Sequence, residues 1–339
     1  MKVLVTGGLG FIGSHTVVAL QNKGYEVIII DNLSNSNIEV LDGITKITGI
    51  QPKFEKIDLR DKSKVIDFFN RHTDLKGIIH FAASKAVNES VQKPLLYYEN
   101  NITTLIYVLQ QMQSHLLQNI IFSSSCTVYG EPDKLPITET DPVKPALSPY
   151  GNTKQIGEEI IKDSSKAYGL KAIALRYFNP IGAHPSSLIG ELPNGVPQNL
   201  IPFITQTAIG KRPQLSVFGN NYPTEDGTAI RDYIHVVDLA QSHVVAMERL
   251  IQKKNKSDFE IFNIGTGRGS SVMEIINAFE KVNNLKLNYK IVDRREGDVV
   301  AVWADTSFAE IELGWKAQLS MEDALRDAWQ WELKLEQKQ

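Results

Sequence analysis

The chain has very little cysteine and no long apolar run, and both deficits exclude whole classes of protein. Cys126 is the one cysteine among 339 residues, so no intrachain disulfide can form. That suits a reducing compartment, and we expect a cytoplasmic protein. No apolar stretch approaches about 18 residues, so no membrane-spanning helix is predicted. The N-terminus, MKVLVTGGLG, is a strand followed by glycines and is unlike a secretory signal peptide.

Nucleic-acid binding and metal binding also lack support. The net charge of −3 gives no reason to expect nucleic acid or an anionic membrane as partner. The seven histidines show no H-x-x-x-H ligand spacing, so we predict no metal site. His80 and His235 lie in apolar, strand-like runs and are interpreted as core or strand-end residues. The composition, 42% hydrophobic and 22% charged, is that of an ordinary globular protein.

Short apolar runs alternate with helical stretches along the first half of the chain. Continuous apolar runs between helices are typical of parallel strands buried on both faces. We therefore predict an α/β fold, a Rossmann-type doubly wound parallel sheet, with a smaller C-terminal substrate-binding α/β lobe. The predicted strands are KVLVTG near the N-terminus, EVIIID at 26–31, and the runs at 77–83, 119–125 and 171–179.

The first strand runs into a glycine-rich turn, VTGGLGFIGS, that opens a helix. Gly8, Gly10 and Gly13 satisfy G-x-G-x-x-G, and Gly7 with the last two satisfies G-x-x-G-x-x-G. Such glycines let the backbone approach a pyrophosphate, which then sits on the helix N-terminus. Asp31 ends the second strand 18 residues after Gly13, where an acidic residue accepts the adenosine ribose hydroxyls. A carboxylate there repels a 2′-phosphate, so NAD is favoured over NADP.

The alternation of strands and helices changes after residue 180, where the chain becomes rich in Pro, Gly and Asn. We therefore predict an NAD-binding Rossmann domain at 1–180 and a nucleotide-sugar-binding domain at 181–339, with a return of the segment near 237–267 to the first domain. A second acidic residue, Asp58, ends the third strand. It either holds the adenine edge of the cofactor or caps the following helix, and we favour the cofactor.

A tyrosine and a lysine stand four positions apart in LSPYGNTKQ. Ser148 suits an N-cap and Gly169 a helix C-terminus, so a helix is predicted over 150–168. Positions i and i+4 share a helix face, which places Tyr150 beside Lys154. Near a bound nicotinamide, the Lys154 ammonium and the positively charged nicotinamide ring would both lower the pKa of the Tyr150 phenol and let it work as acid or base. The alternative is an exposed aromatic–lysine pair.

Three serines, Ser123 to Ser125, end a predicted strand at the carboxyl edge of the sheet, where ligands bind in such folds. One hydroxyl could share a proton with the substrate and Tyr150. The alternative is local capping of a turn.

These motifs together resemble the extended short-chain dehydrogenase/reductase group. Over about residues 1–335 the chain is similar, more closely, to the UDP-glucose (UDP-galactose) 4-epimerase family. The stretches that carry the similarity are SSSCTVYGE, SPYGNTK, RYFNPIGAHPSS, VFGNNYPTEDGTAIRDYIHVVDLA and RREGDVVAVWAD. The resemblance implies reversible epimerisation at C4 of UDP-glucose and UDP-galactose, through a transient 4-keto sugar and tightly bound NAD.

The resemblance also assigns roles to individual residues. Tyr150 takes the 4-hydroxyl proton, Lys154 tunes it and holds the nicotinamide ribose, and Ser125 assists the proton transfer. Besides Gly7, Gly10 and Gly13, the NAD contacts map to Phe11, Ile12, Asp31, Asn32, Asn35, Ser36, Asp58, Leu59, Phe81, Lys85, Asn100 and Phe178. Besides Ser125, the nucleotide-sugar contacts map to Asn179, Asn199, Leu200, Val217, Phe218, Arg231, Tyr233, Arg295, Asp298 and Val302.

Some positions depart from the family pattern. Val302 stands where members restricted to glucose and galactose carry tyrosine, which implies room for UDP-N-acetylglucosamine and UDP-N-acetylgalactosamine unless a neighbouring side chain fills the gap. Cys126 replaces an alanine, and Ala83–Ser84 replaces a common Gly-Leu. The resemblance also implies a homodimer, in which helices at 95–117 and 150–168 would form a four-helix interface.

Two other functions fit the same fold. An NAD-dependent nucleotide-sugar dehydratase shares the Y-x-x-x-K pair, but in that family an Asp-Glu pair follows the serine or threonine strand end. Here Cys126 and Thr127 follow Ser125. A non-enzymatic dinucleotide sensor should have lost Tyr150 or Lys154, and both are present.

Overall fold

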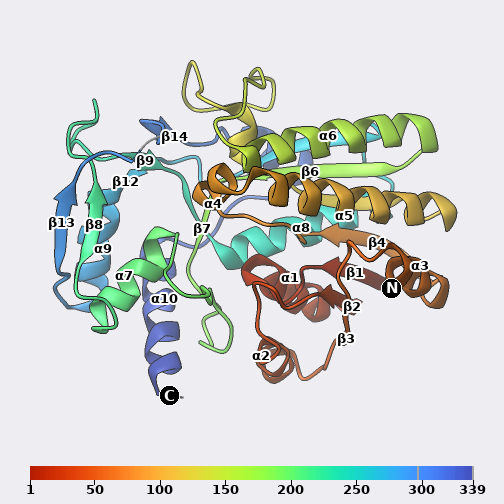
Figure 1. Ribbon diagram of the computed structural model, residues 1–339, viewed down its shortest axis with the longest axis horizontal. Helices are drawn as coiled ribbons and strands as arrows, with labels where there is room; N and C mark the ends of the chain where they lie inside the picture. Colours follow the sequence, from red (N-terminus) through yellow and green to blue (C-terminus); the bar gives the residue numbers. More distant parts are fainter. Residues whose placement is uncertain (296–297, 338–339) are drawn as a thin grey trace.

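Seven parallel strands form the central sheet of the computed structural model, which describes residues 1–295 and 298–337 (Figure 1). The order across the sheet is β11-β6-β5-β4-β1-β2-β3, and every neighbouring pair is parallel. This confirms the predicted Rossmann-type sheet. Its strands are β1 (Lys2–Thr6), β2 (Glu26–Asp31), β3 (Lys53–Lys56), β4 (Leu75–His80), β5 (Asn119–Ser123), β6 (Lys171–Tyr177) and β11 (Phe259–Ile264).

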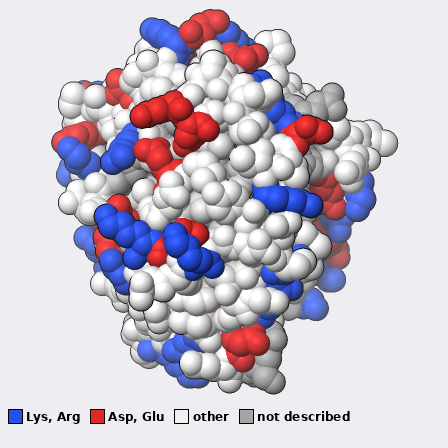
Figure 2. All heavy atoms as spheres, turned by 90° about the vertical axis from the view of Figure 1, so that its left-hand side faces the viewer, with Lys and Arg blue, Asp and Glu red and all other residues white. Residues whose placement is uncertain are grey.

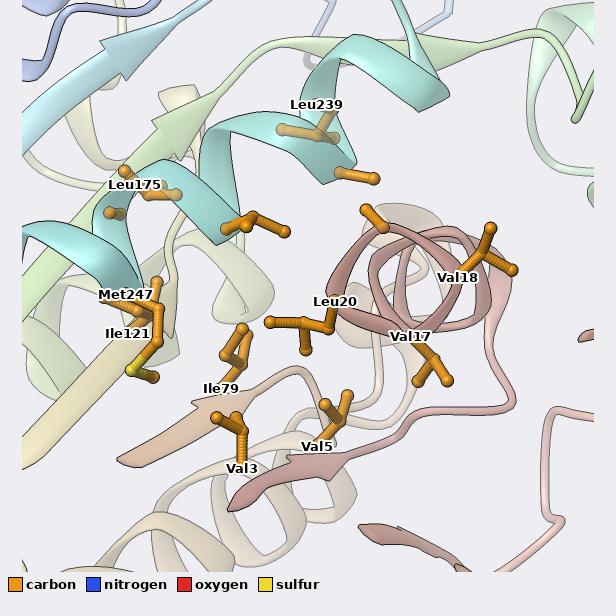
Figure 3. Packing of buried hydrophobic residues seen from close by; sticks show 14 of the residues in the cluster. Val3, Val5, Val17, Val18, Leu20, Ile79, Ile121, Leu175, Leu239 and Met247 are labelled. Atoms are coloured by element: carbon orange, nitrogen blue, oxygen red, sulfur yellow. The ribbon is translucent and has the colours of Figure 1, made fainter. Parts of the chain in front are cut away.

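Helices cover both faces of this sheet, which explains why its strands are apolar at successive positions. Val3 and Val5 of β1 pack in one core cluster, whereas Leu4 between them packs in another. Figure 3 shows the first cluster, with Leu20 pointing toward Ile79 and Val5. The helices α1 (Phe11–Asn22), α2 (Val40–Thr48) and α8 (Val236–Ile251) contribute to the first cluster, and α3 (Lys62–Arg71), α5 (Pro94–Ser114) and α6 (Pro149–Tyr168) to the second.

The predicted return to the first unit is present and is larger than the sequence indicated. Strand β11 pairs with β6 at the edge of the sheet, and α8 packs against α1. A second segment also returns, because Ala309 and Leu313 of η2 (Ala309–Leu313), with the nearby Trp315, pack in the same cluster as α1 and α8. No periodic pattern in the sequence predicts this contact, because η2 is a short π-helix that buries only Ala309 and Leu313.

A smaller lobe lies on the left of Figure 1, built from short strands and three helices. Its core joins Ile204, Val217, Phe279 and Leu325. Figure 2 views this side and shows acidic and basic side chains interspersed. The helices are α7 (Leu200–Ala208), α9 (Val272–Asn283) and α10 (Met321–Glu336), and the strands are β7 (Asn179–Ile181), β8 (Leu215–Phe218), β9 (Ile230–Arg231), β10 (Tyr233–His235), β12 (Ser270–Ser271), β13 (Tyr289–Val292) and β14 (Ala301–Val302).

The strand order reverses between β1 and β4, because successive strands leave β1 in opposite directions. Ligands of open α/β sheets bind outside the carboxyl ends of the strands at such a switch point. The glycine-rich turn follows β1, and residues 81–85 follow β4, so both lie at this crevice. Within the described ranges, the model contains no helix whose length and hydrophobicity would allow it to cross a bilayer.

Three predicted elements end earlier than expected. Strand β4 ends at His80, before the predicted limit at residue 83, and β5 ends at Ser123, before the predicted limit at residue 125. Ser125 has left the sheet and caps the short helix η1 (Cys126–Tyr129) by accepting from the Thr127 N–H. The predicted run 171–179 divides at Phe178, because Asn179 pairs with β10 in the smaller lobe.

Candidate active site

The glycine-rich turn has the geometry that a pyrophosphate requires. Gly7 has φ +68°, and a Cβ on it would lie 2.8 Å from the Ala82 nitrogen. A Cβ on Gly13 would lie 2.3 Å from the Gly7 oxygen. Gly10 is the N-cap of α1 and has no side chain to occupy the N–H groups of Phe11 and Ile12. These donors and the helix dipole therefore favour an anionic ligand, so the turn fits a dinucleotide.

Two predicted cofactor carboxylates are held by their surroundings. Asp31 accepts from the Leu9 and Leu33 backbone N–H groups at 3.1 and 2.9 Å and from the Ser36 hydroxyl at 2.8 Å, so it faces the glycine turn. Asp58 lies just beyond β3, and hydrogen bonds from Arg60 lower its pKa to about 2. The alternative of a helix cap is wrong for Asp58, because Asp61 caps α3 by accepting from Lys64.

The other predicted NAD residues surround the same edge. Asn32 donates to Asp58 at 3.4 Å, and Asn100 donates to Ser84 at 3.2 Å. Asn35 is exposed on the loop after β2. Leu59, which follows Asp58 in the chain, is buried. Phe81 stacks obliquely on His243 of α8, with ring centroids 4.7 Å apart.

Tyr150, Lys154 and Ser125 meet at the junction of α6 and β5. The predicted helix is confirmed: Ser148 accepts from the Gly151 N–H at 3.1 Å, and Gly169 ends it with φ +71°. Tyr150 and Lys154 are 7% and 4% exposed, which rules out a surface pair. The Lys154 ammonium lies 5.7 Å from the Tyr150 ring centroid and donates to the Ser123 carbonyl at 2.6 Å.

The predicted lowering of the Tyr150 pKa depends on the nicotinamide as well as on Lys154, and the protein's own groups do not supply it by themselves. Burial raises the pKa of Tyr150 well above its usual value, and hydrogen bonding from Ser125 only partly opposes this. Burial also lowers the pKa of Lys154 to about 8. Within the described residues Lys154 has the one acceptor, Ser123, so an ammonium with three donors can still bind ribose hydroxyls. The buried lysine therefore fits a nicotinamide riboside.

Strand register brings several predicted sugar-nucleotide residues together. Asn179 on β7 pairs with Tyr233 on β10, and Arg231 on β9 pairs with Val302 on β14. The last pair lies beside the buried Asp232, which accepts from the Thr266, Gly267 and Ala304 backbone N–H groups and ties these strands together.

Arginines gather near Val217 and Phe218, two of the predicted nucleotide-sugar residues. The Arg295 guanidinium lies 5.6 Å from the ring centroid of Phe218, which is 44% exposed, whereas Val217 is buried. Asp298 accepts from Arg295 at 2.7 Å and lies 3.7 Å from Arg231, so one carboxylate links two cations suited to a diphosphate. Between Arg295 and Asp298, Glu296 and Gly297 of the quoted motif lie outside the described residues.

A third group of predicted residues lies between the lobes. Glu191 accepts from Lys85 at 3.3 Å and from Asn199 at 2.6 Å, so it links a predicted cofactor residue to a predicted sugar-nucleotide residue. Leu200 begins α7 directly after Asn199. Val302 and Phe178 share a buried cluster with Tyr129.

Sequence reasoning missed two buried polar residues at this site. Asn101 donates to Thr153 of α6 and to the Ser84 carbonyl, both at 3.0 Å, and fixes the loop after β4. Glu158 binds Ser124 and Arg176. The available signal for Glu158 was its spacing, four residues beyond Lys154 on the face of the helix that also carries Tyr150.

Comparison with known proteins gives a consistent result. The family model described as GDP-mannose 4,6 dehydratase matches residues 4–328. UDP-glucose 4-epimerase of Pasteurella multocida is 49% identical over 335 residues, which cover 98% of each chain. Two of the solved structures that are similar to this chain are UDP-glucose 4-epimerases. That from Stenotrophomonas maltophila, with bound NAD and formylated UDP-arabinopyranose, has a TM-score of 0.96, 44% identity and full coverage of both chains. That from Bifidobacterium longum, in complex with NAD+ and UDP, has a TM-score of 0.94, 45% identity and 98% coverage of each.

Gly13→Ala tests the dinucleotide turn. We expect the purified wild-type protein to release NAD on denaturation, and the variant to release less than about a tenth as much, because the new Cβ collides with the Gly7 backbone. Gly24→Ala is the control, since it strains a residue at φ +82° in open space away from the turn. Equal NAD content in Gly13→Ala and wild type would contradict this site.

Proposed function

Because this chain belongs to the UDP-glucose 4-epimerase family of extended short-chain dehydrogenases/reductases, we infer that it is an NAD-dependent isomerase that interconverts UDP-glucose and UDP-galactose at C4. The observation that carries this conclusion is the buried group formed by Tyr150, Lys154 and Ser125 at the carboxyl edge of the sheet. A proton acceptor, a cation and a hydroxyl lie together where a dinucleotide fold presents its ligand.

The matching family model is described as a dehydratase, so the alternative to epimerisation is the elimination of water. The residues that follow Ser125 are Cys126 and Thr127, at the start of η1. Burial raises the pKa of the Cys126 thiol to about 12, and neither residue is a carboxylic acid. An acid and base pair for elimination is therefore not supplied at this position, which favours epimerisation.

The chain's own residues then take the following roles. Tyr150 accepts the proton of the sugar 4-hydroxyl and later returns it, Ser125 relays it, and Lys154 holds the nicotinamide ribose. The hydride chemistry at C4 would be supplied by NAD bound beside these residues. Arg231 and Arg295 bind the diphosphate, and Phe218 packs on the uracil, so the 4-keto sugar stays anchored through UDP while it turns over. Net redox is zero, which requires that the cofactor remain in place.

A homodimer in the cytoplasm is the setting that we propose for this reaction. Helices α5 and α6 pack side by side on one face of the sheet (Figure 1). Ile102, Ile106 and Ile156 are only partly buried there, which suits a further helix pair from a second copy. The single thiol, Cys126, is consistent with a reducing compartment.

The activity is tested with UDP-galactose and purified protein without added cofactor. We expect UDP-glucose to form, because the bound NAD is regenerated in every turnover. Product analysis by chromatography distinguishes the two sugars. If UDP-galactose persists unchanged although NAD is present in the protein, the proposed activity is wrong.

Tyr150→Phe removes the proton acceptor and preserves the ring. We expect kcat to fall by at least about 10²–10⁴-fold, the contribution of a general base, whereas the NAD content stays at the wild-type level. Steady-state kinetics on UDP-galactose give the result. A variant within about tenfold of wild type would mean that another group takes the proton.

The sugar pocket has a second property, which we propose from Val302. By resemblance this residue lines the C2 side of the sugar, where a tyrosine would occupy the space of an acetamido group. Val302 lies in a buried cluster with Val128, Tyr129, Ile137, Phe178 and Ala304. For one of these side chains to fill the space of a tyrosine ring at position 302, the packed cluster would have to shift. We therefore propose that UDP-N-acetylglucosamine and UDP-N-acetylgalactosamine are also substrates.

Val302→Tyr is the matching test. Wild type is expected to convert UDP-N-acetylgalactosamine, and Val302→Tyr to lose this activity while it keeps most of its activity on UDP-galactose, because the ring fills the acetamido space. The measurement is kcat/KM for both sugars in both proteins. Val302→Ala is the control for a change at this position that adds no volume. A wild type that is inactive on the acetamido sugar would refute dual specificity.

A further inference from the structure

We propose that Glu158 is a positioning residue for epimerisation: its carboxylate keeps the Lys154 side chain charged and fixes the strand end that carries Ser125. This inference rests on the proposed function, in which Lys154 and Ser125 act at the nicotinamide and the sugar. Glu158 does not contact the reacting atoms itself.

The geometry links one helix face to three consecutive serines. Tyr150, Lys154 and Glu158 are spaced i, i+4 and i+8 on α6, so they lie in one row. Lys154 donates to the Ser123 carbonyl at 2.6 Å, and the Ser124 hydroxyl donates to Glu158 at 2.5 Å.

Ser125, the next residue, lies close enough to Tyr150 to oppose in part the effect of burial on the pKa of the phenol. The anchor at Glu158 therefore sets where Ser125 leaves the sheet, and with it the distance between the serine hydroxyl and the phenol. Without the hydrogen bond between Ser124 and Glu158, the end of β5 could shift relative to α6.

Burial favours the neutral amine form of the Lys154 side chain. Burial lowers the pKa of Lys154 to about 8, and the Glu158 carboxylate acts against that change. The other titratable neighbours supply no negative charge: burial lowers the pKa of His80 on β4 to about 3, and that of the Tyr150 phenol is well above its usual value. In the described part of the chain Glu158 is thus the anion that sustains the ammonium.

Arg176 on β6 orients the Glu158 carboxylate. It donates to the two carboxylate oxygens at 2.9 and 2.6 Å, and both side chains are more than nine-tenths buried. A buried ion pair is a poor source of stability, because desolvation offsets the attraction. A purely structural role would make the two partners of the pair equivalent, whereas the proposed role depends on the carboxylate alone.

Glu158→Gln tests this difference, with Arg176→Met as the matched variant. An ammonium is lost as the pH rises through its pKa, so a lower pKa of Lys154 removes activity at a lower pH. We expect the alkaline limb of the kcat profile on UDP-galactose to move down by about 1 unit in Glu158→Gln, the lower end of what a nearby opposite charge does. Arg176→Met breaks the same ion pair and keeps the carboxylate, so its alkaline limb stays in place or moves up.

The second measurement separates the roles from a loss of fold. Glu158→Gln leaves a buried arginine without a partner, so the double variant Glu158→Gln/Arg176→Met, which buries no unpaired charge, is compared with Arg176→Met. These two proteins differ only at Glu158, and we expect the double variant alone to show the lowered alkaline limb. A wild type that is inactive on UDP-galactose would overturn the proposed function; an active wild type whose alkaline limb is unchanged in Glu158→Gln and in the double variant overturns this inference.

Discussion

The packing of α6 against the carboxyl end of β5 is the contact on which the site depends. It buries a phenol, an ammonium and a carboxylate in one row, and each lies near one of three consecutive serines. Burying such groups is unfavourable unless each has a partner. The cap by Ser148, which is worth about 1 kcal/mol in a typical helix, fixes the first turn and therefore the register of the whole row.

A second constraint acts in the smaller lobe, where the sugar-nucleotide residues lie on very short strands. A two-residue strand has few ladder bonds of its own, so its position depends on what anchors it. Asp232 supplies the anchor, because it is fully buried and accepts from the backbone N–H groups of Thr266, Gly267 and Ala304. This places Arg231 beside Val302 and so brings the proposed diphosphate-binding side of the pocket next to its proposed sugar side.

The sequence predicts the regular part of the molecule well, for physical reasons. Strands buried on both faces are apolar at every position, and α6 has a cap residue and a C-terminal glycine, so β1, β2 and α6 are found close to their predicted bounds. The serine strand end was placed less well, because Ser124 and Ser125 are held by side-chain bonds to Glu158 and Thr127 rather than by the ladder. Asn101 and Glu158 gave no motif of their own, since their roles arise from contacts between elements distant in sequence.

Burial of the site has two opposing effects on the chemistry proposed for Tyr150. The proposed reaction passes through a 4-keto sugar, and the hydride would stay behind on the cofactor if that sugar escaped. Burial of the site excludes water from this reaction. The same burial opposes the phenolate, and the Lys154 charge is weakened by it as well. In the proposed role of Tyr150, the phenol becomes a competent base when further positive charge and the substrate hydroxyl are brought next to it, which would tie proton removal to the assembled complex. The row of Tyr150, Lys154 and Glu158 then acts as one electrostatic unit, in which each buried charge or potential charge is sustained by the next.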